Sequence, residues 1–240
     1  MPVIATKPIR LISFDLDDTL WDVRPALEAA EAAQWQYLEQ RYPDLKLRLT
    51  PGTELKFIRN QLLTEEPTLA HHISRFREAF ISRLLQANGV DPTEANEAAA
   101  NAFAAFYAER HKVVVYEDAH AVLEDLGQSF LLGSLTNGNA DVNQTPIGSC
   151  FDFAWRAEQF GVSKPDPALF HRAFESAGVT AQEVIHVGDC HDNDVTGAIN
   201  AGAQAIWYNP DGETSTVADA AIRHLRDLPD AISDLVRSLD

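Results

Sequence analysis

Residues 11–20 read Leu-Ile-Ser-Phe-Asp-Leu-Asp-Asp-Thr-Leu, a short apolar run that passes directly into three carboxylates. Similar apolar runs follow later in the chain, at residues 130–135, 184–187 and 205–208. Helix-period stretches lie between these later runs, at residues 167–177 and 195–201. Strands that alternate with helices indicate βαβ units and a parallel sheet. The sequence therefore predicts an α/β core, and the right-handed crossover rule brings its strand ends to one edge.

The segment between Pro25 and His111 has a different character, because strand-like runs give way to Ala, Glu, Gln and Leu with helical periodicity. About four helices are predicted from its breaks, which are Pro43, Pro51, Pro67, Asn88-Gly89 and Pro92. We therefore expect a core formed by residues 1–23 and 112–240, with a helical insertion at residues 24–111.

Composition and charge exclude several classes of partner. The 36 acidic and 19 basic side chains give a formal net charge of −17, which disfavours nucleic acid and anionic membranes because both are bound through basic residues. The sequence holds no apolar run of 18 residues, the length that a membrane span needs. Two cysteines, Cys150 and Cys190, are too few for a disulfide framework and predict a reducing, cytoplasmic setting.

Asp15 and Asp17 follow the first predicted strand. At positions i and i+2 of an extended backbone they face the same side, while Leu16 packs the other way. Two such carboxylates repel each other unless a cation or a shared proton offsets their charge. Mg²⁺ prefers one or two carboxylates together with phosphate and water. A helix N-cap or an Asx turn is the alternative explanation for such an Asp cluster.

The second predicted strand ends in Thr136, Asn137 and Gly138, whose hydroxyl, amide and backbone N–H groups can donate to a phosphate. An ordinary turn explains the same residues equally well. Lys164, just before a predicted helix, offers the fixed positive charge that a phosphoryl group requires, or else is simply solvated.

Gly188 follows the third predicted strand and precedes Asp189, Asp192 and Asp194. A carboxylate-rich site selects a hard cation, so neighbouring Cys190 and His191 are left out of the ligand set, and His191 is interpreted as a solvated loop residue. Open α/β sheets bind ligands outside the carboxyl ends of their strands. Three strands that end in acidic, hydroxyl-amide and acidic groups therefore predict one shared site.

These motifs resemble, in order, the four motifs of the haloacid dehalogenase superfamily of phosphohydrolases: Asp15-Leu16-Asp17-Asp18-Thr19, Thr136-Asn137, Lys164-Pro165, and Gly188-Asp189 with Asp194. The resemblance implies a Rossmann-like parallel-sheet core and makes residues 24–111 the helical cap of that superfamily. The chain also resembles the bacterial riboflavin-pathway branch of the superfamily in the longer sequences around these motifs, at residues 14–24, 136–140, 163–167, 186–198 and 206–210. That branch dephosphorylates 5-amino-6-(5-phospho-D-ribitylamino)uracil and flavin mononucleotide.

The resemblance also implies a mechanism on a small phosphorylated metabolite. Asp15 would attack phosphorus and form an aspartyl-phosphate, while Asp17 would act as general acid and then as general base. Thr136, the backbone around Asn137, and Lys164 would bind the phosphate oxygens. Mg²⁺ would be held by Asp15, the Asp17 carbonyl and Asp189, with either Asp194 or Asp192 as the second acidic partner.

Two alternatives remain beside this phosphatase. One is a sugar-phosphate phosphatase or phosphomutase of the same superfamily. The other is a non-catalytic module that binds a phosphorylated ligand, which should have lost at least one motif residue. An Asp at position 17 favours phosphoryl transfer over carbon–halogen cleavage, since the latter needs neither a general acid there nor magnesium.

Overall fold

A computed structural model describes residues 7–44 and 53–239 of the chain. The predicted break at Pro51, like the other residues at 1–6, 45–52 and 240, lies outside the described part. The chain divides into two compact units. The core unit comprises Met1–Asp22 and Val113–Asp240, and the helical unit comprises Val23–Lys112.

The core unit is built on a parallel sheet that, in the described part of the chain, has six strands in the order β3-β2-β1-β4-β5-β6. The strands are β1 (Leu11–Phe14), β2 (Leu131–Thr136), β3 (Phe153–Arg156), β4 (Val184–Gly188), β5 (Gln204–Tyr208) and β6 (Ala220–Ile222). The predicted strands correspond to β1, β2, β4 and β5. The two strands that the sequence analysis missed, β3 and β6, are the edges of the sheet.

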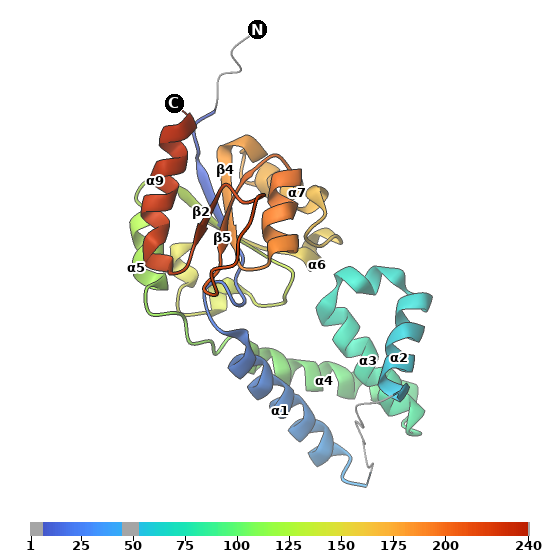
Figure 1. The fold of residues 1–240 in the computed structure, drawn as a ribbon. Helices are drawn as coiled ribbons and strands as arrows, with labels where there is room; N and C mark the ends of the chain where they lie inside the picture. The colour runs from blue at the N-terminus through green and yellow to red at the C-terminus, as the bar shows by residue number, and fades with distance from the viewer. Residues whose placement is uncertain (1–6, 45–52, 240) are drawn as a thin grey trace. The chain divides into compact units, whose positions relative to one another are not determined.

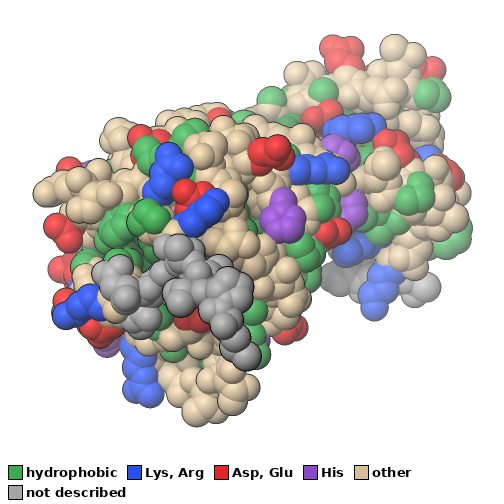
Figure 2. Space-filling view, turned by 90° about the horizontal axis from the view of Figure 1, so that it is seen from above, with side chains coloured by type: hydrophobic (Ala, Val, Ile, Leu, Met, Phe, Trp, Pro, Cys, Tyr) green, Lys and Arg blue, Asp and Glu red, His purple; other side chains and the backbone are tan. Residues whose placement is uncertain are grey.

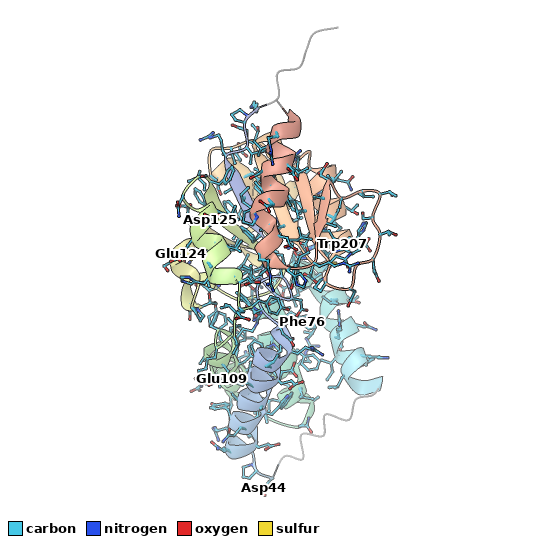
Figure 3. The ribbon with its side chains drawn as sticks, turned by 60° about the vertical axis from the view of Figure 1, so that its left-hand side comes forward. Asp44, Phe76, Glu109, Glu124, Asp125 and Trp207 are labelled. Atoms are coloured by element: carbon cyan, nitrogen blue, oxygen red, sulfur yellow. The ribbon has the colours of Figure 1, made fainter. Side chains whose placement is uncertain are left out.

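Helices cover both faces of this sheet (Figure 1). On one side lie α5 (Ala119–Leu126) and α9 (Leu228–Leu239), and on the other α6 (Ala157–Phe160) and α7 (Pro167–Ser176), with α8 (Gly197–Asn200) packed on α7. Each longer helix buries one face: in α5, Val122 and Leu123 are buried, whereas Glu124 and Asp125 point outward (Figure 3). Burial on both faces explains the continuous apolar runs of the central strands.

The helical unit contains α1 (Val23–Arg41), α2 (Thr53–Glu65), α3 (Ile73–Ala87) and α4 (Pro92–Arg110), with a 3₁₀ turn at Pro67–His71. Its main packing is of α4 against α1 and α3. The alanines of α4 allow this close approach, since Ala95, Ala98 and Ala102 are buried against Leu38 and Leu85. The fold class predicted from the sequence, a parallel α/β core with an inserted helical segment, is confirmed.

The surface carries charges of both signs. On the face shown in Figure 2, Lys and Arg side chains lie among Asp and Glu side chains and do not form one continuous basic patch. In the described ranges, no helix has the length and apolar character needed to cross a bilayer.

Candidate active site

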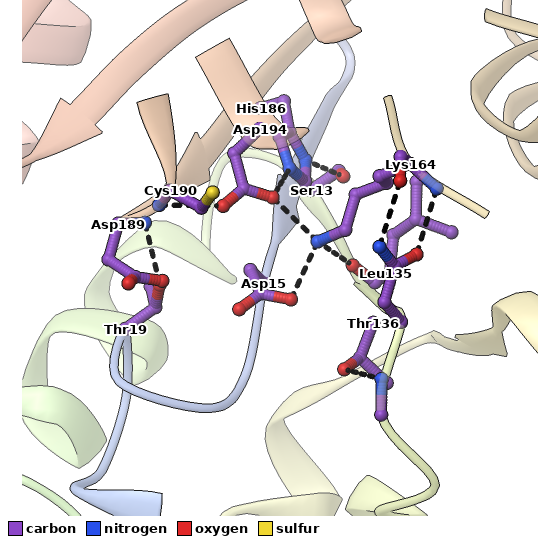
Figure 4. A network of polar contacts seen from close by, with 12 residues as sticks. Ser13, Asp15, Thr19, Leu135, Thr136, Lys164, His186, Asp189, Cys190 and Asp194 are labelled. Atoms are coloured by element: carbon purple, nitrogen blue, oxygen red, sulfur yellow. Dashed lines mark hydrogen bonds and ion pairs between the residues drawn. The ribbon is translucent and has the colours of Figure 1, made fainter. Parts of the chain in front are cut away.

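The carboxyl ends of β2, β1 and β4 bring the predicted site residues to one edge of the sheet. These strands are neighbours, and Phe14 of β1 lies level with Ser134 of β2 and Val187 of β4. Asp15 and Asp189 therefore leave adjacent strands side by side, as Figure 4 shows. We call this group the strand-end site; it comprises Asp15, Asp17, Thr136, Lys164, Asp189 and Asp194.

Lys164 is the hub of the strand-end site. Its ammonium donates to Asp15 Oδ1 at 2.6 Å, to Asp194 Oδ1 at 2.6 Å and to the Leu135 carbonyl at 2.8 Å. The side chain is buried, so the alternative of a solvated lysine is wrong. Asp166 caps α7 by accepting the Ala168 N–H, and Pro167 occupies its first turn, so the segment that carries Lys164 is fixed by an ordinary helix start.

The carboxylates of the site are strongly perturbed by burial and by one another. Burial raises the pKa of Asp15 well above its usual range, Lys164 opposes this shift, and Asp194 adds to it. Burial also raises the pKa of Asp189 to about 6, with a further contribution from Asp194. At Asp194 burial acts in the same direction, but Lys164 and His186 outweigh it and hold the pKa at about 2. Perturbed carboxylates in one cluster are typical of functional sites.

The donor set of the site fits a divalent cation. One oxygen from each of Asp15, Asp189 and Asp194 lies within 4.8 Å of the other two. Three carboxylates against the Lys164 ammonium leave an excess of negative charge, and oxygen ligands of this kind are those that Mg²⁺ prefers. Asp192 points into solvent, with 94% of its side chain exposed, so it is Asp194 that the fold brings to this cluster.

Asp189 is held in place by two side chains. The Asp189 N–H donates to Thr19 Oγ1 at 3.0 Å, and the Thr19 hydroxyl donates to Asp189 Oδ1 at 3.1 Å. The Trp207 indole, which extends from β5 (Figure 3), donates to the Asp189 carbonyl at 2.7 Å. Both the main chain and the carboxylate of Asp189 are thereby fixed.

The loop after Asp189 differs from its prediction at His191. His191 begins a π-helical turn, His191–Thr196, its ring nitrogen lies 2.8 Å from Ser215 Oγ, and its ring packs edge-on against Trp207. His191 is therefore half-buried by its contacts with Trp207 and Ser215, and it stands in a π-helical turn where the sequence predicted a solvated loop residue. Both thiols, Cys150 and Cys190, are free.

Thr136 and Asn137 are placed differently from each other. Thr136 Oγ1 accepts the Gly138 N–H at 2.9 Å, which leaves its hydroxyl proton available for donation. The Asn137 side chain instead accepts from the Lys164 N–H at 2.8 Å and donates to the Lys164 carbonyl at 3.0 Å. Asn137 thus ties the end of β2 to the lysine segment through its amide, and a phosphate role is left to its main chain.

Asp17 leaves a tight turn after β1. Its carboxylate accepts from the Trp21 indole N–H at 2.9 Å, and Trp21 is fully buried. Asp18 adopts the left-handed backbone region, with φ of 59°, which Asp tolerates better than most residues. The turn sets the direction in which the Asp17 side chain leaves the backbone, and that side chain is half-buried.

Comparison with known proteins agrees with this geometry. A family model described as haloacid dehalogenase-like hydrolase matches residues 9–202. The chain belongs to this family. It is 33% identical over 203 residues to 5-amino-6-(5-phospho-D-ribitylamino)uracil phosphatase YigB of Escherichia coli (strain K12), an alignment that covers 85% of this chain and 84% of YigB. Phosphoserine phosphatase of Thermus thermophilus is 34% identical over 147 residues, or 59% of this chain and 57% of that protein.

A solved structure of a 2-haloacid dehalogenase from Pseudomonas syringae pv. Tomato DC3000 is also similar. It is 41% identical with a TM-score of 0.89, and the match covers 95% of this chain and 99% of that one. The family match and the phosphatase relatives together identify the chain as a phosphomonoester hydrolase, which confirms the predicted enzyme class. The alternative of a non-catalytic module is set aside.

Four residues that hold this family's motif residues in place had no role predicted from the sequence: Ser13, Thr19, His186 and Trp207. Ser13 and His186 carried a visible signal, because each is a polar residue inside an otherwise apolar strand. The roles of Thr19 and Trp207 depend on tertiary pairing between β1, β4 and β5, which the local sequence does not encode.

Proposed function

We propose that this phosphatase is Mg²⁺-dependent and hydrolyses a small phosphorylated metabolite through an aspartyl-phosphate on Asp15. The observation that carries the proposal is the buried Lys164 ammonium, bonded to Asp15 and Asp194 beside the Asp189 carboxylate. A fixed cation among several carboxylates is the arrangement that phosphoryl transfer requires, since negative charge spreads over the phosphoryl oxygens in the transition state.

Asp15 is proposed as the nucleophile. One of its carboxylate oxygens attacks phosphorus as the bond to the ester oxygen breaks, and the phosphoryl group is transferred to Asp15. Its Oδ1 is engaged by Lys164, which supports a fixed orientation for the attack. A divalent cation beside Asp15 favours its ionised form, which opposes the effect of burial on its pKa.

Asp17 is proposed as the general acid and base. It donates a proton to the leaving ester oxygen, and its carboxylate then takes a proton from the water that attacks the aspartyl-phosphate. Inorganic phosphate leaves, and both carboxyl groups return to their starting states. The hydrogen bond from Trp21 restricts the rotamers of Asp17 and supports this role.

Asp15, Asp189, the Asp17 carbonyl and Asp194 are proposed to hold the ion directly or to orient its shell. When bound, Mg²⁺ supplies charge neutralisation and a fixed orientation for the phosphoryl group. The Thr136 hydroxyl, the main chain at Asn137 and the Lys164 ammonium are proposed to bind the remaining oxygens. Lys164 pairs with carboxylates on two sides, so it serves both the nucleophile and the metal site.

The substrate that we favour is 5-amino-6-(5-phospho-D-ribitylamino)uracil, with flavin mononucleotide as a second candidate. The support is the 33% sequence identity to YigB, in an alignment that covers 85% of this chain, together with the resemblance of the core motif sequences to the riboflavin-pathway branch. We further propose that residues 24–111 act as the cap that selects the substrate. The cytoplasmic location stays a prediction.

A second candidate activity is hydrolysis of 2-haloacids, favoured by the similarity to the Pseudomonas syringae protein. Asp17 and the crowded carboxylates argue against it. A halide leaves without needing a proton from Asp17, and the reaction needs no divalent cation to offset the carboxylate cluster.

The test is a panel of substrates with and without Mg²⁺. Phosphate release is measured from the ribitylaminouracil phosphate, flavin mononucleotide, glucose 6-phosphate and phosphoserine, and halide release from 2-chloropropionate. We expect Mg²⁺-dependent phosphate release, fastest from the ribityl substrate. Halide release without Mg²⁺ would contradict the proposed Mg²⁺-dependent phosphate hydrolysis. Equal rates on all the phosphate esters would contradict the proposed ribityl substrate. Conversion of glucose 6-phosphate to an isomeric sugar phosphate would indicate a mutase.

A further inference from the structure

Ser13 and His186 form a polar pair inside the sheet, behind the strand-end site. Ser13 of β1 lies level with His186 of β4, and both side chains are fully buried. Ser13 Oγ and His186 Nδ1 are 2.6 Å apart, and His186 Nε2 lies 3.1 Å from Asp194 Oδ1. Figure 4 shows the resulting line from Ser13 through His186 to Asp194. Buried polar groups of this kind are costly unless all their hydrogen bonds are made.

The hydrogen-bond partners of Asp194 determine which atoms donate in the bonds that join Ser13, His186 and Asp194. Asp194 accepts from the Lys164 ammonium and, through Oδ2, from the Cys190 N–H at 3.0 Å, so it is an ionised acceptor. His186 must therefore donate to Asp194 from Nε2. Since burial disfavours a charged ring, Nδ1 is left as an acceptor, and the Ser13 hydroxyl donates to it.

The ring itself is held from two sides. Phe170 packs edge-on against His186, with 5.2 Å between ring centroids, and the Ser13 hydroxyl bonds the ring at Nδ1. On the far side of Asp194, a Cβ at Gly188 would overlap the carboxyl group, so the carboxylate rests directly on the main chain. Asp194 is thus enclosed by a glycine and by three donors, which are the Lys164 ammonium, the Cys190 N–H and the His186 ring.

We infer that Ser13 and His186 are positioning residues, which orient Asp194 and, through it, the Lys164 ammonium and the metal-binding carboxylates. The inference rests on the proposed function, because the group that Asp194 helps to hold is the proposed ion. Hydrogen-bond partners one layer behind a metal ligand raise metal affinity by fixing the ligand, and their loss typically costs about 10- to 100-fold in affinity or activity.

Four variants separate positioning from folding. His186→Leu removes the donor to Asp194, whereas His186→Gln retains an N–H at a similar distance from the main chain. Ser13→Ala removes only the hydroxyl that donates to His186 Nδ1. Thr145→Val is the matched control, because Thr145 is a buried hydroxyl that donates to the Val142 carbonyl at 2.7 Å and lies outside the strand-end site.

Mg²⁺ affinity is measured by calorimetric titration without substrate, alongside kcat and KM for the best substrate and the unfolding midpoint in urea. We expect His186→Leu to weaken Mg²⁺ binding about 10- to 100-fold. Ser13→Ala, which removes one neutral hydrogen bond, should weaken it about fivefold. His186→Gln should recover most of the loss, and Thr145→Val should lower the unfolding midpoint with no change in Mg²⁺ affinity.

Nitrogen-15 spectra of the wild-type histidine rings provide a readout that needs neither metal nor substrate. The expected result is a His186 ring protonated at Nε2 and bare at Nδ1; a proton on Nδ1 overturns the inference even if His186→Leu fails to fold. Wild-type Mg²⁺ affinity retained in Ser13→Ala and His186→Leu also overturns it. If the wild-type protein binds no Mg²⁺, the proposed function fails instead, and the tautomer remains measurable.

Discussion

Lys164 forms its ion pairs out of contact with solvent, whereas the ion pairs of the helical unit lie at the surface. Those surface pairs include Arg41–Glu94, Arg75–Glu66 and Arg83–Glu65, each with one or both side chains substantially exposed. Exposed pairs contribute little to stability, while a buried charge that loses its partner is strongly destabilising. A buried ion pair such as those of Lys164 therefore bears on stability more than the exposed pairs of either unit, among them Arg226–Asp118 of the core unit, and the helical unit relies on apolar packing.

The largest expected effect comes from removing the hub of the strand-end site. Lys164→Met leaves Asp15 and Asp194 buried without their ammonium, and we expect a loss of about 3 to 5 kcal/mol in unfolding free energy. The matched variant Lys112→Met breaks an exposed pair with Glu109 in the helical unit and should cost less than about 1 kcal/mol. Urea unfolding of both variants provides the measurement. Equal stability of the two would remove the contrast between the regions.

Asp194 and Asp192 provide the same comparison of a buried charge with an exposed one, two residues apart in the chain. Asp194→Asn removes a buried charge that pairs with Lys164, and we expect Mg²⁺ affinity and kcat to fall by about 10- to 100-fold. Asp192→Asn changes an exposed side chain and should leave both unchanged. Steady-state kinetics over a range of Mg²⁺ concentrations distinguish the two. A larger loss from Asp192→Asn would reverse the assignment of the second acidic partner.

Arg77 is an exception within the helical unit, and it sharpens the comparison. Arg75 is exposed, but the Arg77 guanidinium lies 3.9 Å from the Phe106 ring centroid and is largely covered. Arg77→Met should therefore lower the unfolding free energy by about 1 to 2 kcal/mol. Arg75→Met should change it by less than about 1 kcal/mol. Hydrogen exchange of the α3 and α4 amides tests this, and equal protection in both variants would contradict it.

The smallest effect is expected at Glu183, a half-buried carboxylate of the core unit. The N–H and hydroxyl of Thr180 donate to Glu183 and, with Arg10, lower its pKa to about 2. Because the folded pKa lies below the unfolded value of about 4.3, this stabilisation is complete above that value and is lost as pH falls through about 2. Glu183→Gln should thus be slightly less stable at pH 7 and converge with the wild type near pH 2. Melting temperatures across this range measure it; a constant difference would contradict it.

The strands that were predictable from the sequence are the central ones. β1 and β4 are buried along their whole length and are mostly apolar, whereas β3 and β6 lie at the sheet edges and are only partly buried. Short edge strands are buried less completely, so their sequence pattern is weak. Local sequence was thus informative where burial was complete and uninformative at the edges.

The site was predictable in its residue types but not in its connections. Asp15, Lys164 and Asp194 are motif residues, but the bonds that join them depend on the register of strands far apart in sequence. The sequence left Asp192 and Asp194 as alternatives because both follow Asp189 closely. Their burial separates them, since the π-helical turn points one inward and the other into solvent.

The central claim is that Asp15 carries the phosphoryl group during turnover. The direct measurement is to quench the enzyme in acid during steady-state hydrolysis, reduce it with borohydride, and map the modified residue by peptide mass spectrometry. The account predicts homoserine at position 15 in the wild-type enzyme and no modification in Asp15→Asn. Homoserine at Asp17 or Asp189, or an unmodified position 15 in an enzyme that is turning over substrate, would contradict it.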